Sequence, residues 1–366
     1  MIVMNDFKKE YAFFKQNIDA AFLSVMESGW YILGPKVEEF EKVFAEYIGV
    51  PYCIGVANGL EAIQITLMAL HIGKGDEVLT VSHSAVATTL AITNVGATPV
   101  FVDIDEYYHM DASTLESYIT PRTKAIVPVH LYGQALDMDT INEVAKKHNL
   151  AVIEDACQAA GAEFHGKKTG SMGVFGCFSF YPTKNLGGYG DGGAITTSSP
   201  DLYQKCKMLR NYGQRNRYHH EIQGINSRLD ELQAAILLAK LPRLDECNKK
   251  RNEFAQIYLK ELAGVSQIVL PKLRDNSFHI FHLFVIEAEK RDELMKFLSA
   301  EGVQSLIHYP VPIHKQQCYS EYNNVTLKNT EEKVNTILSL PMHPFMEEGE
   351  VVKVCDAVKK FYAAQG

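Results

Sequence analysis

Between residues 50 and 200, short runs of β-forming residues alternate with helical stretches, and this alternation limits the fold more than any other feature. Helical patterns start after Gly59, after residue 81, at Asp111 and at Asp137. Between them lie the expected strands, at 53–56, 77–81, 99–102, 125–129, 150–153, 177–180 and 194–197. Such alternation is typical of crossover units around a buried sheet. The sequence therefore predicts an α/β fold with a mostly parallel central sheet.

Helical patterns flank this region on both sides. Two helices, 11–27 and 36–47, are expected before it, and Gly34-Pro35 separates one helix from the other. After Arg228 a long helical pattern begins, is interrupted at Pro242 and then resumes. Proline interrupts a helix because it lacks the backbone N–H and its ring clashes with the preceding turn.

The C-terminal part of the chain has a different pattern. Residues 265–366 contain a strand-like run at 281–286 and two further helices. A chain of 366 residues exceeds the usual size of a single core. We therefore expect a large domain of residues 1–245, with the N-terminal helices included, and a smaller C-terminal α+β domain of residues 246–366.

Composition and charge exclude several classes of protein. A formal net charge of -8 argues against a nucleic-acid or anionic-membrane surface as the main partner. The seven cysteines are widely spaced and form no CxxC motif, so we expect neither a disulfide framework nor a metal site. The first residues become charged at once, unlike a signal peptide, and no apolar run reaches membrane-spanning length. A soluble protein of the cytoplasm is expected.

Lys184 and Asp155 carry the strongest indication of chemistry. Pyridoxal 5'-phosphate (PLP) needs an amine to hold its aldehyde and an anion to keep its pyridine nitrogen protonated. A lysine with a carboxylate upstream at a strand end meets both needs. Taken singly, the residues have plainer interpretations, namely a solvated surface lysine and an aspartate that caps a helix. They stand in the runs Asp155-Ala156-Cys157-Gln158 and Ser179-Phe180-Tyr181-Pro182-Thr183-Lys184-Asn185-Leu186-Gly187.

Three neighbouring motifs bear on the same chemistry. Gln158 is expected to share a helical face with Asp155 and to reach the cofactor's ring oxygen, or to be an ordinary polar helix residue. Asn58-Gly59-Leu60 opens a helix directly after a strand, where N–H groups bind phosphate, although simple capping by Asn58 fits equally well. The glycine-rich run 187–193 lacks the Lys-Ser/Thr ending of a P-loop and is interpreted as a tight turn into the next strand.

With these residues in place, the chain resembles the DegT/DnrJ/EryC1/StrS family of PLP-dependent nucleotide-sugar aminotransferases over nearly its whole length. Besides Asp155, Gln158, Ser179 and Lys184, ordered blocks of sequence carry the resemblance. They are Gly29-Trp30-Tyr31-Ile32-Leu33-Gly34, Ala57-Asn58-Gly59, Pro128-Val129-His130-Leu131-Tyr132-Gly133, the segment 224–235 and Ile307-His308-Tyr309-Pro310.

The resemblance implies the aspartate aminotransferase (type I) fold and a homodimer with active sites shared between subunits. It also implies roles for residues. Lys184 would hold the cofactor and move protons, Asp155 would pair with the pyridine nitrogen, and Gln158 would contact the ring hydroxyl oxygen. The phosphate would be bound by Ser179, by the N–H groups of Gly59 and Leu60, and by Asn226 of the partner subunit, while His308 and Tyr309 would lie near the sugar.

The activity implied is transfer of the amino group of L-glutamate to the C3 keto group of a dTDP-linked 3-keto-6-deoxyhexose. A C4-aminating transaminase is the near alternative. A PLP-dependent sugar dehydratase typically has histidine in place of Lys184, and a regulatory protein without catalysis is the remaining alternative on this fold. The keto-sugar, the ring carbon, the product stereochemistry and the choice of dTDP or UDP stay open.

One position departs from the family pattern. Relatives often place an aromatic residue against the cofactor ring where this chain has Ala85, within Ser82-His83-Ser84-Ala85-Val86-Ala87-Thr88. Stacking on that face is therefore absent or falls to another side chain such as His83. Some relatives share this form, so we interpret it as a subgroup trait.

Overall fold

The structure, a computed structural model, describes residues 1–364 and has a seven-stranded mixed sheet at its centre. The strand order is β1-β9-β8-β5-β4-β2-β3; β9 runs antiparallel to both neighbours, and the other pairs are parallel. Every strand predicted from the alternation is present, so the predicted sheet is confirmed. The strands are β1 (Tyr52–Val56), β2 (Glu77–Val81), β3 (Thr98–Val102), β4 (Thr123–Ile126), β5 (Ala151–Asp155), β8 (Phe175–Ser179) and β9 (Gly193–Thr197).

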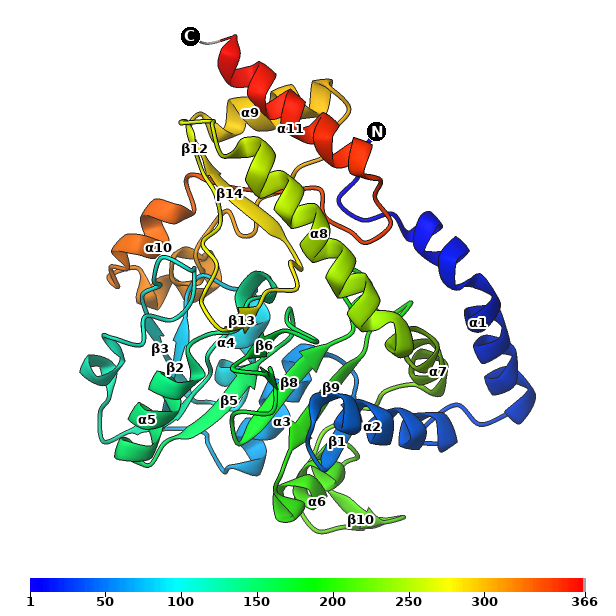
Figure 1. Cartoon of the computed structure of the whole chain (residues 1–366). Coiled ribbons are helices and arrows are strands. Elements are labelled where there is room, and N and C mark those ends of the chain that lie inside the picture. The colour runs from blue at the N-terminus through cyan, green and yellow to red at the C-terminus, as the bar shows by residue number, and fades with distance from the viewer. Residues whose placement is uncertain (365–366) are drawn as a thin grey trace.

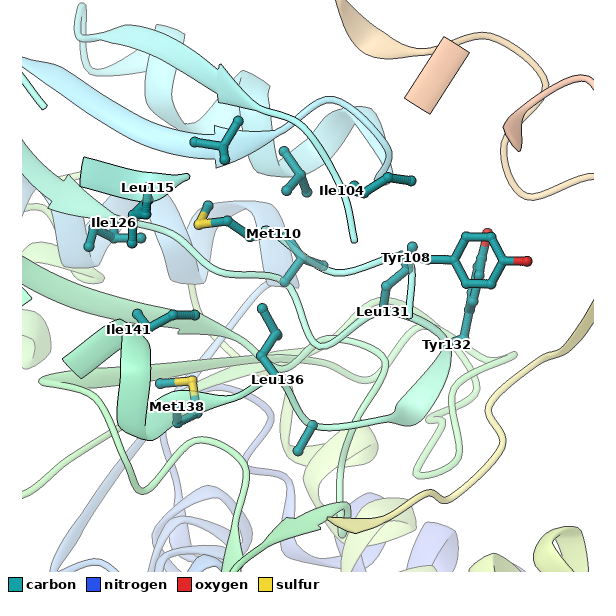
Figure 2. Packing of buried hydrophobic residues seen from close by; sticks show 14 of the residues in the cluster. Ile104, Tyr108, Met110, Leu115, Ile126, Leu131, Tyr132, Leu136, Met138 and Ile141 are labelled. Carbon is teal, nitrogen blue, oxygen red and sulfur yellow. The ribbon is translucent and has the colours of Figure 1, made fainter. Parts of the chain in front are cut away.

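The inner strands send alternate side chains into two hydrophobic layers. Leu79 and Ile126 belong to the layer that α5 (Met138–His148) covers, whereas Val78 and Ala125 belong to the layer that α3 (Gly59–Ala69) covers. Figure 2 shows the first layer, in which Ile126, Met110 and Leu115 pack near residues of α5. Because successive strand residues point to opposite faces, strands buried on both faces are nearly continuous hydrophobic runs.

The long helices lie outside this sheet. The side chain of Asp6 caps α1 (Phe7–Ser28), and Gly29 ends that helix in the left-handed conformation. The interruption predicted at Pro242 is confirmed, because the 3₁₀ turn η3 separates α7 (Glu231–Lys240) from α8 (Leu244–Leu262). Figure 1 shows α1 along one side of the molecule and α8 running from α7 towards the C-terminal part.

A smaller antiparallel sheet, with strand order β12-β14-β15, organises the C-terminal part. Side chains of α8, including Phe254 and Tyr258, join α9 and α11 in a hydrophobic core of their own beside this sheet. In Figure 1 these two C-terminal helices lie at the opposite end of the molecule from α6 and β10. Ile2 pairs with Val303, so the first residues also lie against this part. A domain boundary at residue 245 stays a prediction.

Among residues 1–364 no helix is long and apolar enough to cross a bilayer. The other helices and strands complete the fold. The remaining α-helices are α2 (Pro35–Ile48), α4 (Val86–Asn94), α6 (Pro200–Leu209), α9 (Arg291–Ala300), α10 (Lys328–Lys333) and α11 (Glu348–Ala363). The remaining strands are β6 (Glu163–Phe164), β7 (Lys167–Lys168), β10 (Gln214–Asn216), β11 (His219–His220), β12 (Ile268–Val269), β13 (Ser277–Phe278), β14 (Phe284–Ala288) and β15 (Ile337–Leu340). The 3₁₀ helices are η1 (Leu115–Tyr118), η2 (Leu131–Gly133), η3 (Leu241–Arg243), η4 (Ile313–Lys315) and η5 (Gln317–Tyr322).

The prediction of an α-helix that begins at Asp111 is wrong. The segment contains only the 3₁₀ turn η1, and the Asp111 side chain accepts hydrogen bonds from the N–H and hydroxyl of Ser113 instead of capping an α-helix. The hydroxyls of Thr114 and Ser117 also donate to backbone carbonyls three residues earlier. Such local side-chain bonds compete with helix formation, which explains the short turn.

Candidate active site

A pocket of about 460 Å³ opens at the carboxyl edge of the central sheet. The loops that line it follow β1, β2, β4, β5 and β8, all of which run in the same direction. Open α/β sheets bind ligands at this edge. The structure brings together here most of the residues singled out from the sequence, namely Gly59, Leu60, Asp155, Gln158, Ser179 and Lys184.

Asp155 ends β5 and is buried on the pocket wall. Its Oδ2 accepts a hydrogen bond of 2.7 Å from the hydroxyl of Thr88, and its Oδ1 accepts one of 3.1 Å from the N–H of Cys157. No helix follows in this segment, so the interpretations of Asp155 as a helix cap and of Gln158 as a helical neighbour are wrong. The chain instead makes two successive turns, from Ala156 onwards, that lead into β6.

Gln158 reaches the pocket through the first of these turns. Its Oε1 accepts a hydrogen bond of 2.8 Å from the N–H of Tyr132, and its Nε2 donates one of 3.1 Å to the hydroxyl of Tyr309. The side chain is buried, and both ends of the amide are engaged. Gln158 thereby lines the pocket together with Asp155.

Lys184 lies in the loop between β8 and β9, with its side chain half-buried in the pocket. Within residues 1–364 its Nζ has no hydrogen-bond partner. Burial lowers the pKa of the amine below the usual value for lysine, and the nearby Cys157 and Asp155 only partly oppose this effect. A lysine is protonated below its pKa, so a lowered pKa leaves more of the nucleophilic neutral amine at a given pH.

The start of α3 forms the floor of the pocket beside Ser179. The first N–H groups of a helix have no partners within the helix and attract anions. A Cβ on Gly59 would lie 2.6 Å from the Sγ of Cys157 and 2.9 Å from the Cβ of Ser179, so the close approach requires glycine. Asn58 caps the helix by accepting from the N–H of Glu61, and this capping leaves the N–H groups of Gly59 and Leu60 for a ligand.

Asn226, His308 and Tyr309 do not line this pocket. Asn226 is exposed and pairs through its backbone with Asn211, outside the pocket of its own chain. Tyr309 lies next to the site through its hydrogen bond with Gln158. The ring of His308 is held by Ser339 at 2.8 Å, and burial together with the charge of Lys184 lowers its pKa to about 4, so the imidazole is neutral near pH 7.

The Ala85 face of the pocket carries no aromatic side chain from the segment 82–88. Ala85 lines the pocket, whereas His83 does not. The imidazole of His83 is buried and bonds to the hydroxyl of Tyr132 instead. The suggestion that His83 replaces the missing stacking residue is therefore not supported by its position, and Ala85 with Thr88 forms the wall here.

Sequence reasoning missed Thr88, Cys157 and Tyr132 as neighbours of the site. Tyr132 stood inside a family-like block and Cys157 inside the run Asp155-Ala156-Cys157-Gln158, but nothing in the sequence shows which side chains meet across the sheet edge. The glycine-rich loop, by contrast, behaves as predicted, since it leads directly into β9 at Gly193. In the described part of the chain no cluster of His, Cys, Asp or Glu could hold a metal ion.

The side chains present fit PLP. A lysine with a depressed pKa, a buried carboxylate and a helix start that admits only glycine stand around one pocket. They match the aldehyde, the pyridine nitrogen and the phosphate of the cofactor. A model of the DegT/DnrJ/EryC1/StrS aminotransferase family matches residues 13–359. The chain belongs to this family. The predicted enzyme class, a PLP-dependent nucleotide-sugar aminotransferase, is confirmed.

Individual relatives of this aminotransferase match it over nearly the full length. A dTDP-3-amino-3,6-dideoxy-alpha-D-galactopyranose transaminase of Aneurinibacillus thermoaerophilus is 47% identical, covering 99% of each chain. A dTDP-3-amino-3,4,6-trideoxy-alpha-D-glucose transaminase of Streptomyces venezuelae is 44% identical, covering 97% of this chain and 95% of the relative. The crystal structure of S. venezuelae DesV in complex with ketimine intermediate superposes with a TM-score of 0.96 at 43% identity, covering 99% and 98% of the two chains. The predicted fold is thereby confirmed.

Proposed function

We propose that this aminotransferase moves the amino group of L-glutamate to the C3 keto group of a dTDP-linked 3-keto-6-deoxyhexose. The observation that carries the transamination is the meeting of Lys184 and Asp155 in one pocket with the start of α3. The choice of C3 and of dTDP rests on the two relatives above, whose names describe dTDP-3-amino sugar transaminases.

PLP, when bound, supplies an aldehyde that accepts amino groups and a ring that withdraws electrons. The carboxylate of Asp155 would hold the proton on the pyridine nitrogen and so maintain that withdrawal. Gln158 would donate to the ring oxygen. Ser179 and the N–H groups of Gly59 and Leu60 would bind the phosphate. Asn226 of the partner subunit would complete the phosphate site.

With PLP bound, Lys184 would hold the cofactor and would then serve as acid and base. Its free amine would take the proton from the α-carbon of the donor and would deliver a proton at the aldehyde carbon of the cofactor. The depressed pKa suits this role, because the neutral amine is the basic form. Tyr309 bonds to Gln158, and we propose that His308 and Tyr309 lie near the sugar.

We also propose a homodimer in which each active site includes residues of both subunits. The outer face of α1 exposes large apolar side chains, with Phe22 44%, Leu23 55% and Met26 45% exposed. Trp30 and Tyr31 continue this surface beyond the helix. Exposed apolar patches of this kind mark association surfaces. Location in the cytoplasm remains an expectation.

The alternatives differ in chemistry. A C4-aminating transaminase would use the same residues and would differ in the orientation of the sugar, which would present C4 in place of C3. It is therefore the nearest alternative. Lys184 argues against a sugar dehydratase, in which histidine is typical at that position. A purely regulatory protein has no use for a half-buried lysine with a lowered pKa beside a buried aspartate.

A turnover assay separates these functions. The PLP-loaded enzyme is given L-glutamate and a panel of dTDP- and UDP-linked 3-keto and 4-keto sugars, and NMR identifies the aminated carbon. We expect amination at C3 of a dTDP sugar. Lys184→Ala should abolish turnover and the visible absorbance of the lysine-bound cofactor, whereas Lys167→Ala, at an exposed lysine, should change neither. Amination at C4 overturns the regiochemistry, and an unchanged Lys184→Ala enzyme overturns the mechanism.

A further inference from the structure

Tyr132 stands next to the pocket in an unusual backbone conformation. Its φ of 60° and ψ of 3° lie in the left-handed region, although it is not a glycine. L-residues persist there only where their surroundings hold them, and such positions cluster at functional sites. Tyr132 is buried, and its backbone and side chain make three hydrogen bonds to residues around the site.

The backbone of Tyr132 decides how the amide of Gln158 is oriented. An N–H group can only donate, so the Gln158 atom 2.8 Å from the N–H of Tyr132 must be the carbonyl oxygen. The NH₂ group then points the other way and donates to the hydroxyl of Tyr309. Its second hydrogen makes no other hydrogen bond within residues 1–364 and is free for the cofactor, to which Gln158 is proposed to donate.

The hydroxyl of Tyr132 has an equally defined direction. It donates its single proton to the backbone carbonyl of His308. The Nε2 of His83, 2.8 Å from the same oxygen, must therefore be a donor. Burial lowers the pKa of His83 to about 4, so its ring is neutral near pH 7 and carries its proton on Nε2. Within residues 1–364 its Nδ1 has no partner.

We infer that Tyr132 is a positioning residue that holds the Gln158 amide and the His308–Tyr309 segment in one arrangement, with His83 orienting its hydroxyl. One residue thus connects the group proposed to touch the cofactor with the pair proposed to lie near the sugar. The inference rests on the proposed function, because the roles of Gln158, His308 and Tyr309 belong to it.

The chain offers a matched control in Tyr108. Its ring packs edge-on against Tyr132 with centroids 5.6 Å apart, and Figure 2 shows both in the same hydrophobic layer. It is also buried and also has a positive φ, of 64°. Its hydroxyl, however, donates to Glu287 at 3.0 Å and contacts neither Gln158 nor His308.

The test compares Tyr132→Phe with Tyr108→Phe in the PLP-loaded enzyme. Loss of the hydroxyl bonds should let the 308–309 segment move, so Tyr132→Phe should raise KM for the keto-sugar about fivefold to tenfold with a smaller change in kcat. The N–H of Tyr132 still holds the Gln158 oxygen in this variant, but Tyr309 bonds to the Gln158 NH₂ group, so movement of the 308–309 segment should loosen that end of the amide and raise the pH midpoint of the cofactor's visible absorbance. Tyr108→Phe should change KM for the keto-sugar by no more than about twofold and should leave the pH midpoint of the absorbance unchanged within error.

Two further measurements keep the outcomes separate. Thermal unfolding of both variants checks that they lose similar stability. His83→Phe, which removes the donor to the hydroxyl and keeps an aromatic ring at this buried position, should reproduce part of the KM increase. If Tyr132→Phe matches Tyr108→Phe in KM and in absorbance, the inference is wrong. If the wild-type enzyme aminates no keto-sugar, the proposed function fails instead, and the absorbance titration still tests Tyr132.

Discussion

Asp155 depends on a partner that lies far away in the sequence. Its place at the end of a strand and its meeting with Lys184 in one pocket support the proposed role in cofactor binding. Its hydrogen bond from Thr88 joins residues 67 positions apart, and it forms because the start of α4, which follows β2, lies beside the end of β5 at one sheet edge. The neighbouring Thr89 is also buried, yet its hydroxyl has no partner in the described part of the chain.

Thr88→Val should therefore weaken the site while Thr89→Val should not. The first change removes a donor to a buried carboxylate, which we expect to lower the free energy of unfolding by about 1–3 kcal/mol and to weaken PLP binding. The second removes an unpaired buried hydroxyl at nearly constant volume, so stability should stay the same or rise slightly. Urea denaturation and PLP titration of the apoenzymes measure both effects. Equal losses in the two variants would contradict the assigned role of Thr88.

Among the elements, α3 begins at the proposed phosphate site. From the sequence, the motif Asn58-Gly59-Leu60 fitted a cap or a phosphate site equally well, and Asn58 does cap the helix. What distinguishes the site is the space around Gly59, because a Cβ at this position would lie less than 3 Å from side-chain atoms of both Cys157 and Ser179. Gly349, in the first turn of α11, has nothing within 4 Å of the same position.

These two glycines should respond in opposite ways to alanine. Gly59→Ala forces Cys157 or the helix to move, and we expect a loss of about 1–3 kcal/mol in stability together with weaker PLP binding. Gly349→Ala has room and reduces the conformational freedom of the unfolded chain, so it should stabilise by about 0.5–1 kcal/mol and leave the cofactor unaffected. Thermal unfolding with and without PLP distinguishes the two outcomes. A tolerated Gly59→Ala with normal affinity would argue against phosphate at this helix start.

At the scale of the whole molecule, the proposed dimer would explain why Asn226 lies outside the pocket of its own chain. Asn226 is exposed on the segment after β11, and α1 with the residues after it presents apolar side chains to the outside. If Asn226 of the partner subunit binds the phosphate held beside Lys184, neither subunit can form a complete site alone.

Mixing two inactive variants tests this arrangement. Lys184→Ala lacks the reactive amine, and Asn226→Asp places a negative charge against the phosphate, so each homodimer should be nearly inactive. A mixed dimer contains one site with both native residues, and activity should reappear after the subunits are mixed under exchanging conditions. As a control, Lys184→Ala mixed with a chain carrying both substitutions should stay inactive. No recovery in the first mixture, despite exchange shown by native mass spectrometry, would contradict a shared site.

The sequence by itself determined the strands of the central sheet and the break at Pro242, and it predicted most of the residues that line the pocket. These follow from local properties, because hydrophobic periodicity, proline geometry and strand-end position act over a few neighbouring residues. The same local reasoning failed at Asp111 and after Asp155. Side-chain bonds and turns replaced the expected helices there.

Only the tertiary structure decided which side chains meet. Thr88 contacts Asp155, and Tyr132 bonds to both Gln158 and His308, so each contact joins distant segments. His83 likewise lies outside the pocket because it bonds to Tyr132. The same is true of the lowered pKa of Lys184, since desolvation depends on what packs around the amine and not on its neighbours in the chain. Packing of separate loops at one edge of the sheet, which no local pattern encodes, turns these residues into a site.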